Sequence, residues 1–194
     1  ATGANGCTAT ATATVTQLAL SNASISGTLT FCAGGNTILT AAGGGTYAWN
    51  TGATTAGITV SSAGTYTVVV TGGNGCTKTA TATVSALPLP TASISGTLTF
   101  CTGGSTILTA SGGGTYVWST AATTAGITVS SAGTYTVTVT GANGCTKTAT
   151  ATVTQLALPT PSISGTLSFC AGGSTALTAS GGNTYNWSTG ATTA

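Results

Sequence analysis

One feature constrains the fold of this sequence more than any other: it repeats with a step of 69 residues. The step never slips at four marker positions. These are Cys7, Cys76 and Cys145; Cys32, Cys101 and Cys170; Trp49, Trp118 and Trp187; and Tyr47, Tyr116 and Tyr185. Such a unit is too long for one coil of a solenoid but large enough for a small β-sandwich.

The repeat also predicts where the modules begin and end. Proline-containing stretches at 85–90 and 154–159 favour extended backbone and predict short, stiff linkers. The expected organisation is the C-terminal part of one module plus a linker at 1–20, complete modules at 21–89 and 90–158, and the N-terminal part of another module at 159–194.

The residue pattern inside one unit predicts an all-β module. β-branched residues alternate with polar ones between Gly-rich breaks, and no segment has helical periodicity. Ile94, Leu98 and Phe100 are expected on one face of the first strand, and Asn143-Gly144 is a strong hairpin-turn signal. The expected strands lie at 93–100, 105–110, 116–118, 126–129, 132–139 and 146–153.

Two aromatic positions allow two interpretations. Trp118 and Tyr135 could form a platform on which a sugar ring stacks, or Trp118 could fill the core while Tyr135 opens the penultimate strand as a corner tyrosine. Each module has a single tryptophan with which to fill its interior. We therefore predict that Trp49 and Trp118 are buried.

The composition excludes most chemistry. The chain has no Asp, Glu or His, and Lys78 and Lys147 are its only charged side chains. General acid–base catalysis and hard-cation binding both depend chiefly on the missing groups. Two distant lysines cannot neutralise a nucleic-acid backbone, and no apolar run is long enough to span a membrane. We expect no enzyme activity, no cofactor, no metal site, no nucleic-acid partner and no membrane span.

Six cysteines remain to be explained. Each complete unit holds two that are 44 residues apart, and neither lies in a CxxC motif, so a metal site is poorly supported. We predict disulfides between Cys32 and Cys76 and between Cys101 and Cys145, which also implies an oxidising compartment. Cys7 and Cys170 would then pair with neighbouring segments or subunits.

The end segments are expected to belong to modules that neighbouring sequence completes. Either the chain continues in both directions, or separate subunits join head to tail by donating a strand. Joining the two ends would leave a module without the equivalent of residues 57–69, which favours the continuous chain.

The stretch 132–146, AGTYTVTVTGANGCT, resembles the repeats of giant surface adhesins and secreted proteins of gliding bacteria. Its first half also resembles the strand that carries the corner tyrosine in immunoglobulin-like domains. The resemblance implies tandem immunoglobulin-like β-sandwiches, exported to the cell surface or released. Two departures are the cysteine positions, which differ from those of antibody domains, and Gly141, where the family commonly has Asp.

Three functions fit these patterns. The first is an extracellular filament or adhesin stalk in which copies of the module join head to tail. The second is an array of carbohydrate-binding modules, which requires exposed tryptophans. The third is ice binding by threonine rows such as 8–14. Glycans are also expected, since the surface has almost no charge and Asn22 and Asn186 lie in glycosylation sequons; attachment to Ser or Thr is an equal alternative.

Overall fold

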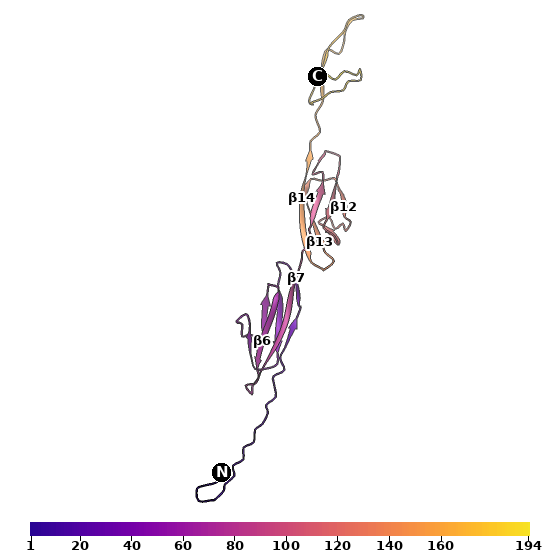
Figure 1. Ribbon diagram of the computed structural model, residues 1–194. Helices are drawn as coiled ribbons and strands as arrows, with labels where there is room; N and C mark the ends of the chain where they lie inside the picture. Colours follow the sequence, from indigo (N-terminus) through magenta and orange to yellow (C-terminus); the bar gives the residue numbers. More distant parts are fainter. The chain divides into compact units, whose positions relative to one another are not determined.

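A computed structural model describes all 194 residues, and its regular structure is entirely β. The chain divides into two compact units, residues 1–89 and 90–194 (Figure 1). None of its segments forms a helix that could cross a membrane.

The first unit contains one complete β-sandwich of seven strands. One sheet has the order β1-β3-β5 and the other β2-β7-β6-β4. The strands are β1 (Ser24–Gly27), β2 (Thr30–Cys32), β3 (Thr37–Ala42), β4 (Thr46–Trp49), β5 (Gly57–Val60), β6 (Gly64–Thr71) and β7 (Thr77–Leu87).

One strand pair of this sandwich is parallel. β2 runs beside the last residues of β7, with Thr30 opposite Ser85 and Cys32 opposite Leu87. All other pairs are antiparallel. The chain therefore leaves the first sheet after β1, crosses to the second as β2, and pairs there with the end of the module.

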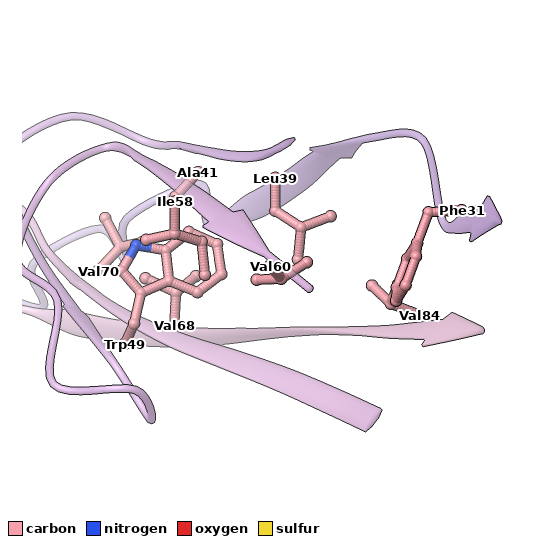
Figure 2. Packing of buried hydrophobic residues seen from close by; sticks show 9 residues of the cluster. All are labelled: Phe31, Leu39, Ala41, Trp49, Ile58, Val60, Val68, Val70 and Val84. Carbon is pink, nitrogen blue, oxygen red and sulfur yellow. The ribbon is translucent and has the colours of Figure 1, made fainter. Parts of the chain in front are cut away.

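The core lies between the two sheets and follows from their alternating sequences. In β3, for example, buried and exposed residues alternate strictly. Figure 2 shows Trp49 packed near Ile58 and Val68 at one end of the core, and Phe31 beside Val84 at the other. The core residues are Phe31, Leu39, Ala41, Trp49, Ile58, Val60, Val68, Val70 and Val84.

The second unit repeats this sandwich. Its sheets have the orders β8-β10-β12 and β9-β14-β13-β11, and β9 is again parallel to the end of β14. The core holds the equivalent residues, from Phe100 to Val153. The strands are β8 (Ser93–Gly96), β9 (Thr99–Cys101), β10 (Thr106–Ser111), β11 (Thr115–Trp118), β12 (Gly126–Val129), β13 (Gly133–Thr140) and β14 (Thr146–Leu156).

Two details differ from the sequence-based expectation. The single strand expected at 93–100 is split into β8 and β9, and Leu98 in the break is 43% exposed rather than packed with Phe100. The last strand of each module is also longer than expected, because pairing with the short parallel strand extends β7 to Leu87 and β14 to Leu156. The linkers are correspondingly shorter.

The end segments carry little regular structure. Residues 2–8 form a turn closed by an isolated bridge between Thr2 and Thr8, and residues 9–20 have no regular structure. Residues 159–194 form one hairpin of β15 (Ser162–Gly165) and β16 (Leu177–Ser180). Phe169, whose equivalents Phe31 and Phe100 are buried, is largely exposed here. This is expected of a sheet that has no second sheet to cover it.

Candidate functional site

The tryptophans of the two complete modules are core residues, as predicted. Trp49 is 4% exposed and Trp118 2% exposed. Each indole nitrogen donates a hydrogen bond to a backbone carbonyl six residues on, Thr55 O or Thr124 O, at 2.9 Å. A buried and fully hydrogen-bonded indole offers no face to a sugar. The exposed tryptophans that carbohydrate binding requires are therefore absent from these two modules.

The tyrosines at the start of the penultimate strands form corners. The Tyr135 hydroxyl donates to Ser131 O at 2.8 Å, and the Tyr66 hydroxyl donates to Ser62 O at the same distance. Both bonds reach back four residues to the backbone, which is the geometry of a tyrosine corner. This part of the prediction is confirmed, and it assigns these tyrosines to the framework of the module.

The cysteines mark the two poles of each module. We call the end where β2 and β7 finish the exit pole, and the end formed by the β6–β7 hairpin at 72–76 the entry pole. Cys32 lies opposite Leu87 at the exit pole, whereas Cys76 directly precedes Thr77 at the entry pole. β7 has 11 residues, so about 33 Å of extended strand separates the two levels.

This separation corrects the predicted disulfides. A disulfide holds two Cα atoms about 4.4–6.8 Å apart, so neither Cys32 with Cys76 nor Cys101 with Cys145 can bond within a module. The thiol states agree. Cys76 and Cys101 are free, as are the exposed Cys7 and Cys170 of the end segments. Cys32 and Cys145 are disulfide-bonded.

Hydrogen bonds tie the entry pole to the chain that enters the module. Asn74 accepts from the backbone N–H of Cys76 at 3.1 Å and donates to Ala19 O at 2.8 Å. Ser21 is buried, and its hydroxyl donates to Cys76 O at 3.0 Å. The hairpin cysteine is therefore held beside the preceding linker.

The outer surface of the four-stranded sheet is a second candidate site. In the second module eight threonines face outward from β13 and β14 as four cross-strand pairs, which we call the threonine face. The first module has only three such pairs, because Val69 lies opposite Thr79 where the second module has Thr138 opposite Thr148. The pairs of the second module are Thr134 with Thr152, Thr136 with Thr150, Thr138 with Thr148, and Thr140 with Thr146.

The remaining predicted positions lie at the surface. Asn22 and Asn186 are exposed and so open to glycan attachment. Lys78 and Lys147 are exposed on the last strands, opposite Val70 and Val139 respectively.

Together these features define a class. Each complete unit is a seven-stranded sandwich of two sheets with a central tryptophan and a tyrosine corner, which is the immunoglobulin-like arrangement. No protein-family model and no curated protein matches the sequence.

Solved structures that the chain resembles include murine CEACAM1b, at 14% identity and a TM-score of 0.32 over 69% of this chain and all of the other. Another is the Ca²⁺-stabilised adhesin with which an Antarctic bacterium binds ice, at 16% identity and a TM-score of 0.40 over 74% of this chain and 52% of the other. A third is a 1.5-MDa bacterial ice-binding adhesin, at 14% identity and a TM-score of 0.31 over 75% and 70%.

Proposed function

We propose that this chain is part of an extracellular stalk or filament built from repeated immunoglobulin-like modules. The observation that carries the proposal is the equivalence of the two complete modules. They have the same strands in the same order, and their cores use the same positions one repeat apart. In both modules the tryptophan and the corner tyrosine, which could have formed a ligand platform, instead belong to the framework.

The position of the poles supports a mechanical role. In each module, taken by itself, the chain enters beside the hairpin that joins its last two strands and leaves at the end of the last strand. This hairpin is β6–β7 in the first module and β13–β14 in the second. Entry and exit are therefore separated by the length of an 11-residue strand, about 33 Å. A tandem array of such modules gains length with every copy.

The compartment follows from the cysteines. Disulfide-bonded cysteines form and persist in oxidising surroundings, which favours the cell surface or the extracellular space. The solved structures reported above include two bacterial adhesins. We assign this chain a supporting role in adhesion and no enzyme activity, with further copies of the module as its partners.

Single-molecule stretching of the full chain under reducing conditions tests the proposal. The sandwich from Ser24 to Leu87 contains 64 residues. At about 3.6 Å per extended residue, and less its folded length, each unfolding module should release about 200 Å. We expect two unfolding events of this size at well-defined forces. Smooth extension without such events would contradict a load-bearing role.

The threonine face favours a second candidate, binding to ice. Its hydroxyl and methyl groups repeat about 6.7 Å along each strand and about 4.8 Å between strands, a regular lattice without charge. Adsorption of the purified chain to growing ice is the test. The double variant Thr138→Lys, Thr148→Lys should weaken adsorption by removing the face of the second module, whereas Thr128→Lys on the opposite sheet should not. Equal adsorption by all three chains, or by none, would eliminate this candidate.

A further inference from the structure

Every linker between modules has a cysteine position on each side of it. At the start of the central linker, Cys32 lies opposite Leu87, and the next residue, Ala33, donates its N–H to Leu87 O at 2.8 Å. Cys32 is thus fixed to the last residue of the first sandwich.

The other side of the same linker belongs to the second module. A Cβ on Gly141 would lie 3.8 Å from Pro90 Cβ, so this hairpin residue contacts the start of the module. The N–H of Gly141 donates to Cys145 O at 2.8 Å. Cys145 is thus fixed close to Pro90, as Cys76 is fixed close to Ala19 and Ser21 in the first module.

The thiol states follow this arrangement. Cys32 and Cys145 are the only two cysteines of the sequence that flank one linker, and they are the two that are disulfide-bonded. None of the other four cysteines has a second cysteine of this sequence across its linker, and all four are free.

We propose that a disulfide bond spans each linker and joins the exit-pole cysteine of one module to the hairpin cysteine of the next, with Cys32–Cys145 as the pair in this chain. Leu87 and Pro90 are three residues apart, so the backbone between them spans at most about 11 Å. By contrast, the rise of an extended strand over the 11 residues of β7 places the two cysteines of one module about 33 Å apart. Connectivity alone therefore favours bonding across the linker over bonding within the module.

The bond forms by thiol–disulfide exchange. Each of the two thiols loses its proton, the sulfurs join, and two electrons pass to an external small-molecule or protein disulfide, which leaves as two thiols. The two cysteines that bond come from different modules, so the first can react only after the second has been made.

The consequence is a covalent bypass. With Cys32 bonded to Cys145, tension between the two ends of the chain runs through the sulfur bridge, and residues 33–144 carry none of it. Most of both sandwiches then cannot be drawn out. The mechanical use of this bypass rests on the proposed stalk function. The disulfide bond itself can be tested independently of that function.

Peptide mapping of the full oxidised chain provides the test. Free thiols are blocked with iodoacetamide in denaturant, and trypsin then cuts after Lys78 and Lys147, giving fragments 1–78, 79–147 and 148–194. The proposed bond holds the first two fragments together until reductant is added, with four blocked cysteines in the whole set. Bonds within the modules would leave all three fragments separate without reductant, and that result would overturn the proposal.

Two variants and one mass measurement sharpen the test. Cys145→Ser should release the two fragments, whereas the matched control Cys101→Ser, in the same fragment, should leave them joined. Linkage that survives Cys145→Ser, or that is lost in Cys101→Ser, would overturn the assignment. With the four free cysteines replaced by Ser, the intact unreduced chain should have the mass of a monomer, and a dimer mass would show that the bond joins different molecules instead. None of these outcomes depends on whether the chain bears load.

Discussion

Two neighbouring residues of β10 offer a strict test of the sandwich. Leu108 is completely buried between the sheets, and Ile107 beside it is 61% exposed on the outer surface. Leu108→Ala removes buried methyl groups and leaves a cavity, at a cost of about 3 kcal/mol within an ordinary range of about 2–5. Ile107→Ala removes a similar side chain from the surface and should cost less than about 1 kcal/mol, through strand propensity.

Guanidinium unfolding followed by tryptophan fluorescence measures both costs. Replacing Trp49 and Trp187 by Phe in every chain leaves Trp118 as the reporter of the second module. With a slope of about 2 kcal/mol per molar denaturant, Leu108→Ala should lower the midpoint by about 1.5 M and Ile107→Ala by less than about 0.5 M. The slope itself should not change. Equal shifts for the two variants would show that the two faces of β10 are not as described.

Three further predictions concern single interactions and charge. Tyr135→Phe removes the hydrogen bond to Ser131 O and should cost about 1 kcal/mol by the same unfolding assay, with an unchanged core. Gly114→Ala should prevent the second module from folding as described, because Gly114 has a positive φ and the new Cβ would overlap Thr140 O. Circular dichroism should show the loss of structure. The control Gly113→Ala has a positive φ but open space around its new Cβ, so this variant should remain folded and only be less stable. Stability should change by less than about 0.5 kcal/mol between pH 4.5 and 7, because the chain has no Asp, Glu or His to titrate; a steep change there would reveal ionisable groups that the sequence lacks.

Local patterns were sufficient to predict much of the module. In 132–139 the alternation of valine and threonine assigns Val137 and Val139 to the core and Thr138 to the surface, and the structure agrees. The burial of Trp118 followed from the need to fill a small core with one large side chain. These predictions hold because each depends only on the two-residue period of a strand and on the side chains nearby.

The switch between sheets could not be predicted in this way. Residues 93–100 keep an alternating pattern throughout, but the backbone turns at Gly96, whose φ is +133°. A Cβ there would overlap Ile107 O, so the close approach of β10 requires glycine at this position. After the turn the alternating side chains belong to a different sheet. Leu98 therefore faces outward, although its even spacing from Ile94 predicts that the two side chains share a face.

That switch also explains why the cysteine pairing was wrong. Spacing along the sequence showed two cysteines in each unit and suggested that they bond to each other. Because the chain crosses to the second sheet, β9 runs parallel to the end of β14, and Cys101 lies opposite Leu156, a full strand length from Cys145. The exact repeat hid the alternative, because a partner cysteine in the same unit and a partner cysteine in the next unit occupy equivalent positions of the repeat. Only the direction of one three-residue strand distinguishes them, because it places the cysteine of that strand at the opposite end of the module from the hairpin cysteine.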